Sequence, residues 1–489
     1  MSTQKRDLTR IRHNTKIVAT LGPGSNSVEL LEDMIRIGGL NVVRFNFSHG
    51  TPEFHQENAK IVREAAKRAG REVAIMADLQ GPKIRVGKLV GGAVELEAGE
   101  KLLLDAALEG EGNRDRVGLD YRDLPKDVKA GDVLLLDDGL LTLIVDSVSG
   151  SEILTTVQNS HKLKSNKGIN KQGGGLSAGA LTEKDFRDLK TAIGIGCDYM
   201  AVSFVKSGED MRTARELVEK EMAGSDAVRP GLVAKIERVE AITNLDEIIE
   251  ASDGIMVARG DLAVEVGNAA VPALQKRMIK RAREMRRFSI TATQMMESMI
   301  TNPVPTRAEV SDVANAVLDG TDAVMCSAET AVGAYPFETV RQMAIICAAA
   351  ESEQDSLIGV DEQAVEQASR VDEAIASGAV HVARQVNAKA IVALTESGTT
   401  AFQVSRYGIQ LPIYALTPSV AAQRRMAMYR GVRPLQIATS KDHDKALSEV
   451  ESMLLERGVL NRGDQYILTS GSAMRESGST NTLQVISVH

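Results

Sequence analysis

The chain has 489 residues, and 58 basic against 66 acidic side chains give it a formal net charge of −8. At roughly 150 residues per domain the length predicts about three domains. The mild acidity argues against nucleic acid as a partner, because a surface that follows phosphates needs a basic excess. A hydrophobic share of 43% and a charged share of 25% exclude disorder as the main state.

The cysteines and the N-terminus indicate a reducing compartment and no membrane. Cys197, Cys326 and Cys347 are too scattered for a disulfide framework or a metal-binding pair, and scarce cysteines are typical of reducing compartments. The polar N-terminus has no apolar signal region, and no run of about 18 apolar residues is long enough to span a bilayer. We therefore expect a cytoplasmic protein without a membrane partner.

Apolar runs of strand length alternate with amphipathic helical stretches along much of the chain. The first three expected strands are Lys16–Thr20, Asn41–Phe45 and Glu72–Ala77, with helices over Ser27–Ile37 and Pro52–Ala69 between them. Five more strands follow later, at Tyr199–Ser203, Leu232–Ile236, Gly254–Val257, Ser289–Ala292 and Ala323–Cys326, with one helix expected over Val271–Arg286. Eight β/α units predict a TIM barrel, with an open doubly wound sheet as the alternative.

Two further segments interrupt or follow this α/β pattern. From about Arg85 to Gly175 the sequence is rich in β-type runs separated by Gly and Asp turns, which predicts an all-β domain inserted into the barrel. After a helix near Phe337–Ala350, the polar stretch 351–363 is expected to be a linker to a C-terminal αβ domain. That domain has strand candidates at Ala390–Leu394, Pro412–Ala415, Gln465–Leu468 and Thr482–Ser487.

We therefore divide the chain into a first barrel segment (1–83), an inserted β domain (84–178), a second barrel segment (179–355) and a C-terminal αβ domain (356–489).

Polar and charged residues follow six of the eight expected barrel strands. Because active sites of TIM barrels lie at the carboxyl ends of the strands, these residues predict a site at one rim. The residues are Arg44 to Gly50, Asp78 to Arg85, Lys235 with Glu237, Arg259 to Asp261, Thr291 with Thr293 and Gln294, and Ser327 with Glu329 and Thr330. Strands that merely end in polar loops would explain one or two such groups, but not this convergence of Arg, Lys, Glu and Asp.

The residue types at this rim suggest phosphoryl or enolate chemistry. Glu237 and Asp261 are hard oxygen ligands suited to Mg²⁺, although either one alone would more simply form a surface ion pair. Arg44, Lys83, Arg85 and Lys235 place cations around that metal, as a transferring phosphoryl group or an enolate requires. The chain has no Walker-type loop, so side chains and the metal would hold the phosphate.

Long motifs at these positions resemble the pyruvate kinase family. They run across nearly the whole chain, and they include ATLGPGS, NVVRFNFSHG, DLQGPKIRVG, VAKIERVEAITNLDEI, IMVARGDLAVEV, ITATQMMESM and GSTNTLQV. The resemblance implies a TIM barrel with a β lid inserted after strand three and a C-terminal regulatory αβ domain. It also implies transfer of the phosphoryl group of phosphoenolpyruvate to ADP, giving pyruvate and ATP in the last step of glycolysis.

The resemblance also implies roles for individual residues. Arg44 would hold the substrate phosphate, Lys235 would stabilise the transferring phosphoryl group and the enolate, and Glu237 with Asp261 would bind Mg²⁺ or Mn²⁺. The Ala258, Arg259 and Gly260 backbone and Thr293 would lie along the substrate carboxylate, and Ser327 with Glu329 would form a water-linked proton relay. Asn46, His49, Arg85 and Lys184 match nucleotide-side positions, although a lone His49 is equally explained as a loop residue.

The chain departs from the potassium-dependent members of this family at two positions. In those members Asn46, Ser48, Asp78 and the carbonyl of a Thr bind K⁺, and a Glu occupies the position of Lys83. Here the Thr is replaced by Leu79 and the Glu by Lys83. This pattern resembles the potassium-independent branch, so K⁺ is not expected to be required. The alternative is that Lys83 forms only a surface salt bridge near the lid hinge.

A loop in the C-terminal domain resembles the effector-phosphate loop of the family. It comprises Thr395, Glu396, Ser397, Gly398, Thr399 and Thr400. Because Glu396 disfavours a second phosphate, the expected effector is a sugar monophosphate or AMP rather than fructose bisphosphate, unless the loop is an ordinary turn. The resemblance implies a homotetramer.

Two other functions remain open from the residues themselves. A Mg²⁺-dependent barrel lyase acting on pyruvate or phosphoenolpyruvate would need the same Arg, Glu and Asp, but not the lid or the nucleotide-side residues. A catalytically dead sugar-phosphate sensor would use only the C-terminal domain, which leaves Lys235, Glu237, Asp261 and Thr293 unexplained.

Overall fold

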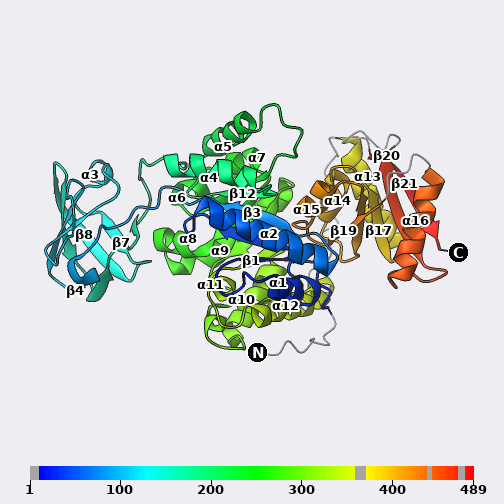
Figure 1. Cartoon of the computed structure of the whole chain (residues 1–489), viewed down its shortest axis with the longest axis horizontal. Helices are drawn as coiled ribbons and strands as arrows, with labels where there is room; N and C mark the ends of the chain where they lie inside the picture. The colour runs from blue at the N-terminus through cyan, green and yellow to red at the C-terminus, as the bar shows by residue number, and fades with distance from the viewer. Residues whose placement is uncertain (1–9, 358–369, 438–442, 472–479, 489) are drawn as a thin grey trace.

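The computed structural model describes residues 10–357, 370–437, 443–471 and 480–488. Figure 1 shows three parts in a row: an inserted β domain at one end, a barrel in the middle and a C-terminal αβ domain at the other end. The described residues place the two smaller domains against opposite ends of the barrel.

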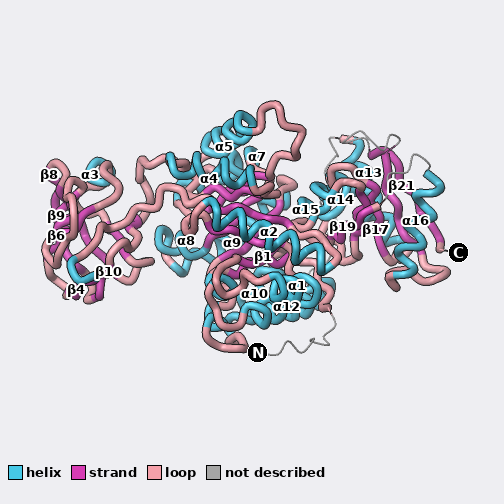
Figure 2. Tube along the Cα trace, viewed as in Figure 1, coloured by secondary structure: helices cyan, strands magenta, loops and turns pink. Residues whose placement is uncertain are grey.

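The central part is a closed barrel of parallel strands in the order β1-β16-β15-β14-β13-β12-β3-β2. This confirms the TIM barrel and excludes the open doubly wound sheet. Figure 2 shows the barrel strands surrounded by helices. The strands are β1 (Lys16–Thr20), β2 (Val42–Asn46), β3 (Ala74–Asp78), β12 (Tyr199–Val202), β13 (Gly231–Ile236), β14 (Gly254–Ala258), β15 (Phe288–Ala292) and β16 (Ala323–Cys326).

The helical layer around the barrel consists of α-helices and short 3₁₀ or π segments. These are α1 (Val28–Asp33), the π segment η1 (Met34–Gly38), α2 (Pro52–Ala69), α4 (Glu183–Gly194), α5 (Gly208–Glu221), α6 (Val239–Thr243), α7 (Leu245–Ala251), α8 (Arg259–Val266), η3 (Asn268–Ala270), α9 (Val271–Glu284), η4 (Glu297–Ile300), α10 (Arg307–Leu318), α11 (Ala328–Ala331) and α12 (Pro336–Leu357). α12 extends to Leu357, into the stretch 351–363 that was expected to be a linker, and Glu351 is buried there, where it accepts from the N–H groups of Asn14 and Thr15.

The barrel interior is filled by aliphatic side chains, as the scarcity of aromatic residues requires. Val18, Met76, Val233 and Met256 are fully buried there, and their apolar cluster continues into C-terminal residues such as Met426. At the amino ends of the strands, the rings of Tyr199 and Phe288 meet edge to face with centroids 5.5 Å apart. The barrel and the C-terminal domain therefore share one continuous core.

The inserted β domain follows β3 and is built on a six-stranded and a two-stranded sheet. Its elements are η2 (Val90–Gly92), β4 (Ala93–Leu96), β5 (Lys101–Asp105), β6 (Arg116–Gly118), α3 (Leu124–Asp127), β7 (Val133–Leu136), β8 (Leu141–Ser149), β9 (Glu152–Val157), β10 (His161–Lys164) and β11 (Ile169–Lys171). Buried and partly buried residues alternate along β7 and β9, as expected for sheets with one buried face.

The chain returns to the barrel through three consecutive glycines. Gly173, Gly174 and Gly175 all have φ between 77° and 89°, a conformation that costs glycine little and other residues much more. The backbone N–H of Gly175 donates to the carboxylate of Glu240, which lies on α6 of the barrel. The inserted β domain therefore ends in three glycines in the left-handed region, and the last of them is tied to α6.

The C-terminal domain is a five-stranded sheet in the order β19-β18-β17-β20-β21 flanked by helices. Its elements are α13 (Val371–Gln385), β17 (Ala390–Leu394), α14 (Thr399–Ser405), β18 (Ile413–Thr417), α15 (Val420–Met426), β19 (Val432–Gln436), α16 (His443–Glu456), β20 (Gln465–Gly471) and β21 (Thr480–Ser487). β19 was not predicted, because Arg433 and Pro434 interrupt its apolar pattern.

Candidate active site

Four charged side chains from three strands form a connected network at the carboxyl ends of the barrel strands. Nε of Arg44 donates to Oδ2 of Asp78 at 2.6 Å, and Nζ of Lys235 lies 3.3 Å from Oδ1 of the same carboxylate. The ammonium of Lys235 also lies 2.9 Å from Oε1 of Glu237. Cation and anion therefore alternate from Arg44 through Asp78 and Lys235 to Glu237, as a site for a charged substrate requires.

Burial makes each of these charges depend on its neighbours. Burial opposes the ionised form of Asp78, but Arg44 and Lys235 outweigh it and hold the pKa of this carboxyl below its ordinary value. Burial also opposes the charge on Lys235, yet Asp78 and Glu237 raise the pKa of its ammonium. Lys235 therefore carries a full positive charge at neutral pH, where a developing phosphoryl or enolate anion would need it.

Glu237 and Asp261 fit a divalent metal ion. Glu237 is 1% exposed, and burial together with the charge of Asp261 raises its pKa. Its Oε1 makes no hydrogen bond of good geometry with the described residues, despite the nearby ammonium. A cation bound between these carboxylates would offset the burial of Glu237 and its repulsion from Asp261, and it would give Oε1 a partner. Among the residues that the structure describes, no group of three His, Cys, Asp or Glu side chains could hold a metal, so water and substrate would complete the coordination, as Mg²⁺ favours.

A second constellation joins β14, α8 and the end of β15. The N–H of Gly260 donates to Oγ1 of Thr293 at 2.8 Å, and that hydroxyl donates to the carbonyl of Ala292. Thr293 has a φ of 70°, which is strained for a β-branched residue. The guanidinium of Arg259 donates to the Thr293 carbonyl at 2.6 Å. The Arg259 side chain thus stabilises the strained turn at Thr293. The backbone of Arg259 lies at the rim, at the start of α8.

Asp312 on α10 anchors the Arg259 side chain from the other side. Both terminal nitrogens of Arg259 donate to the Asp312 carboxylate at 2.7 Å. Bidentate pairs of this kind fix a guanidinium in direction as well as position.

Glu329 binds the backbone of two segments at the rim. Its contact to Ser327 is with the backbone N–H and not with the hydroxyl. Its carboxylate accepts from the backbone N–H of Ser327 at 2.6 Å and of Met296 at 3.1 Å. Glu329 is 1% exposed, so these hydrogen bonds satisfy buried carboxyl oxygens that would otherwise be costly to remove from water. The structure brings Ser327 and Glu329 together, but through a backbone contact.

The two strands for which no candidate was predicted also contribute. Oγ1 of Thr20, at the end of β1, accepts from Arg44 at 2.9 Å. The hydroxyl of Ser203, just after β12, accepts from Nζ of Lys235 at 2.7 Å. Their only sequence signal is a hydroxyl residue at the end of an apolar run, which is too common to single out.

The comparisons with known proteins agree with this geometry. The family model "Pyruvate kinase, barrel domain" matches residues 12–340, and "Pyruvate kinase, alpha/beta domain" matches residues 373–486. The chain belongs to the pyruvate kinase family. It is therefore an enzyme, a phosphotransferase that moves a phosphoryl group between phosphoenolpyruvate and ADP.

Individual relatives match over almost the whole chain. Pyruvate kinase II of Salmonella typhimurium is 51% identical over 98% of this chain and 100% of its own length. Pyruvate kinase of Buchnera aphidicola from Acyrthosiphon pisum is 48% identical, with the same coverage. A solved pyruvate kinase structure from Cryptosporidium parvum superposes with a TM-score of 0.91 at 36% identity, covering 98% of this chain and 96% of that one.

The residues at the nucleotide-side positions of the pyruvate kinase family lie in two places. Nζ of Lys184 donates to the carbonyl of Phe47 at 2.6 Å, which ties α4 to the loop that follows Asn46 and contains His49. Arg85 lies at the entry to the lid, where its N–H donates to Asp120 at 2.7 Å. These four residues thus lie partly on the barrel and partly on the lid.

The positions expected to bind or replace K⁺ are already engaged. Nζ of Lys83 lies 3.8 Å from Oδ1 of Asp261, while Asp78 is paired with Arg44 and Lys235. The carbonyl of Leu79 accepts from the Ser203 hydroxyl at 2.7 Å, and Oδ1 of Asn46 accepts from the N–H of Ser48 at 3.1 Å. Lys83 therefore faces Asp261, one of the two carboxylates expected to bind the metal.

The expected effector loop links β17 to α14. Gly398 has a φ of 90°, and its N–H donates to Oγ1 of Thr395 at 3.0 Å. The hydroxyls of Ser397 and Thr399 lie 2.8 Å apart. Thr400 is buried, with its hydroxyl 2.5 Å from that of Thr480 on β21. The Ser397 side chain is therefore exposed and that of Thr399 half-buried, whereas Thr400 is covered.

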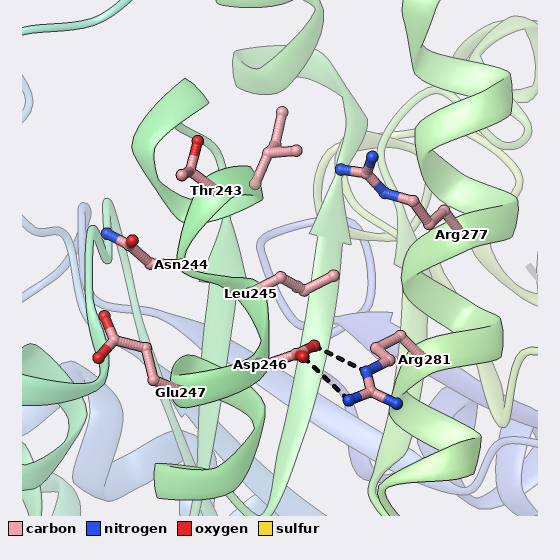
Figure 3. A pocket seen from close by; sticks show the side chains of 8 residues that line it. Thr243, Asn244, Leu245, Asp246, Glu247, Arg277 and Arg281 are labelled. Atoms are coloured by element: carbon pink, nitrogen blue, oxygen red, sulfur yellow. Dashed lines mark hydrogen bonds and ion pairs between the residues drawn. The ribbon is translucent and has the colours of Figure 1, made fainter.

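A pocket of about 490 Å³ lies away from the strand ends, on the outer layer of the barrel. Figure 3 shows Arg281 of α9 paired with Asp246 of α7 across this pocket, with Arg277 beside it. Ile242 and the buried Leu245 line it together with polar and charged side chains, and none of the predicted site residues is among them. In the described part of the chain, no helix is long and apolar enough to cross a membrane.

Proposed function

We propose that the network of Arg44, Asp78, Lys235 and Glu237 is the phosphoryl-transfer site of this enzyme. The observation that supports it most is the buried ammonium of Lys235, held 2.9 Å from Glu237 and 3.3 Å from Asp78. A charged donor preorganised in a dry site stabilises developing negative charge without reorganisation. Lys235 would thus act on the transferring phosphoryl group and on the enolate oxygen that it leaves.

The neighbouring residues would bind and orient the substrate. Arg44 would hold the phosphate, with Asp78 and Thr20 fixing the direction of its guanidinium. Mg²⁺ or Mn²⁺, held by Glu237 and Asp261, would supply charge neutralisation and orient the phosphoryl oxygens. The Ala258–Gly260 backbone would follow the substrate carboxylate, which would therefore lie close to the Thr293 hydroxyl.

The remaining chemistry is protonation of the enolate and exclusion of water. Thr293 lies on a strained turn near the expected carbon, and Ser327 with Glu329 would carry the proton through water. Asn46, His49, Arg85 and Lys184 would contact the nucleotide. Because Arg85 lies at the lid entry, movement of the lid about the three glycines at its end would bring the nucleotide side together and limit hydrolysis.

We further propose how the enzyme is regulated and assembled. The loop from Thr395 to Thr400 would bind a phosphorylated activator, and Glu396 favours a sugar monophosphate or AMP over a bisphosphate. Lys83 would supply the charge that K⁺ supplies elsewhere in the family. The enzyme would act in the cytoplasm as a homotetramer, with the chain division at 83, 178 and 355 separating the lid and the regulatory domain from the barrel.

The Lys235→Met variant tests the central proposal. With phosphoenolpyruvate, ADP and Mg²⁺ in a coupled assay, kcat should fall roughly 10³-fold, since one preorganised charge is lost, while KM changes less. Lys190→Met, an exposed lysine on α4, is the control and should keep wild-type kcat. A Lys235→Met enzyme with more than a tenth of wild-type kcat would remove Lys235 from the phosphoryl-transfer step.

A further inference from the structure

Ser203 makes two hydrogen bonds that together fix the direction of its hydroxyl. Its Oγ donates to the carbonyl of Leu79 at 2.7 Å and accepts from Nζ of Lys235 at 2.7 Å. Ser203 is 1% exposed. A serine hydroxyl has a single proton, and the Leu79 carbonyl can only accept it. The oxygen is therefore left to act as an acceptor toward Lys235.

The next residue holds the other end of the Lys235–Glu237 pair. The backbone N–H of Phe204 donates to Oε2 of Glu237 at 2.8 Å, and Phe204 has a φ of 56°. A bulky residue in this left-handed region is strained, and such strain persists where the surrounding structure imposes it. Here the strain turns the N–H of Phe204 toward Glu237, while Ser203 faces Lys235.

A close backbone approach holds this corner in place. A Cβ on Gly81 would lie 2.9 Å from Cβ of Ser203 and 3.0 Å from the Phe204 ring. The N–H of Gly81 in turn donates to Asp185 on α4 at 3.0 Å. The loop after β3 therefore packs tightly against the corner after β12, and Ser203 has little freedom to change rotamer.

We propose that Ser203 is a positioning residue that fixes the rotation of the Lys235 ammonium. The ammonium has three N–H groups; it donates one hydrogen bond to this neutral hydroxyl and forms ion pairs with two carboxylates. A substrate phosphoryl oxygen must take an N–H that now faces a carboxylate. The N–H that Ser203 binds would stay in place when a substrate oxygen replaces a carboxylate. The other two N–H groups of Lys235 would therefore keep a defined direction. This inference rests on the proposed role of Lys235.

Ser203→Ala tests the proposal, with Ser252→Ala as a matched control. Ser252 is also 1% exposed, and its hydroxyl donates to a backbone carbonyl, that of Ile248, at 2.6 Å. Both variants lose a buried hydrogen bond to a backbone carbonyl, and Ser203→Ala also loses the one from Lys235, so its unfolding midpoint should fall by at least as much as that of Ser252→Ala. Ser203→Ala alone should lower kcat, by roughly 10- to 100-fold for a misdirected group, with KM for phosphoenolpyruvate changed less than about threefold.

Two further measurements separate positioning from packing. The Mg²⁺ concentration for half-maximal activity should not change in Ser203→Ala, because the N–H of Phe204 still holds Glu237. Ser203→Thr, which keeps the hydroxyl, should recover most of kcat. A folded Ser203→Thr enzyme as slow as Ser203→Ala, or equal kcat in Ser203→Ala and Ser252→Ala, would overturn the inference.

The Lys235→Met variant distinguishes the two proposals. If it is inactive while Ser203→Ala is fully active, the role of Lys235 stands and that of Ser203 falls. If Lys235→Met is active, both fall.

Discussion

Arg406 of the C-terminal domain forms a buried ion pair with Asp322, at the amino end of barrel strand β16. Nη1 of Arg406 donates to Oδ2 of Asp322 at 2.9 Å and to the carbonyl of Arg287 at 3.0 Å. The same carboxylate accepts from the N–H of Ser289 at 2.9 Å. One residue of the C-terminal domain therefore holds the starts of two adjacent barrel strands.

Removing Arg406 should destabilise the junction strongly. Arg406→Ala leaves Asp322 buried without its partner, which typically costs about 3–5 kcal/mol. Arg424→Ala is the matched control, because Arg424 pairs across the same junction with Glu72, but both side chains are more than 20% exposed. That pair should be worth about 1 kcal/mol or less. Chemical unfolding monitored by circular dichroism would compare them, and equal losses would show that burial does not set the strength of the contact.

Glu237→Gln should raise the metal requirement of the enzyme. The amide oxygen can still accept from Phe204, but the negative charge facing the metal is lost, so we expect the Mg²⁺ concentration for half-maximal rate to rise tenfold or more, a rough value for loss of a charged ligand. Glu250→Gln, on the exposed face of α7, is the control. Isothermal titration with Mn²⁺ would measure binding without turnover. Unchanged titrations of Glu237→Gln would place the metal elsewhere.

The enzyme should turn over without K⁺. In buffers whose monovalent cation is bulky and organic, added K⁺ should change kcat less than about twofold, because two cations about 4 Å apart repel by roughly 4 kcal/mol at an effective dielectric of 20. Lys83→Glu should lower activity and let K⁺ partly restore it. Lys88→Glu, an exposed lysine at the lid entry, should show neither effect. A wild-type enzyme that is nearly inactive without K⁺ would contradict this proposal.

The loop after β17 should respond to monophosphates. Ser397→Ala combined with Thr400→Ala should abolish activation by a hexose or pentose phosphate or by AMP, and leave maximal kcat near normal. Ser487→Ala, at the opposite end of the same sheet, should be activated as the wild type is. Titration of activator at subsaturating phosphoenolpyruvate gives the readout. Strong activation by fructose bisphosphate alone would argue against the role given to Glu396.

Glu265 should make stability depend on pH. Burial, with the nearby charges of Glu240 and Glu237, raises its pKa to about 7 from 4.5, although Val239 and Arg238 act in the opposite direction. Between these two values the folded protein keeps a proton that the unfolded chain releases, so the free energy of unfolding should fall as pH rises through this window. At 1.36 kcal/mol per pKa unit, the loss should not exceed about 3.5 kcal/mol.

The Glu265→Gln variant checks this pH dependence. Its amide oxygen can still accept from the N–H of Val239, so only the titration is removed. Urea unfolding in EDTA between pH 5 and pH 8 should show a steeper loss of stability for the wild type than for this variant. Glu250→Gln should behave as the wild type does. Parallel pH profiles for wild type and Glu265→Gln would show that Glu265 titrates near its ordinary pKa.

Local sequence patterns predicted much of the fold, because strand and helix periods depend on neighbours in the chain. β1, β16 and β17 have the predicted bounds, and the charged residues after β2, β3 and β13 do lie at one rim. The pattern was insufficient where a residue's environment depends on distant segments. β19 contains Pro434 and an arginine, and it is a strand because β18 pairs with it.

The sequence predicted which residues lie at the rim. Closure of the barrel determines which of these side chains contact one another. Because β12 lies beside β3 and β13, Ser203 reaches both the Leu79 carbonyl and Lys235. The same closure pairs Asp78 with Arg44 and Lys235, which leaves Lys83 to face Asp261. Sequence alone determined which charges reach the rim, since each follows its own strand. Only the tertiary structure decided which charges touch, since a contact depends on strands far apart in the chain.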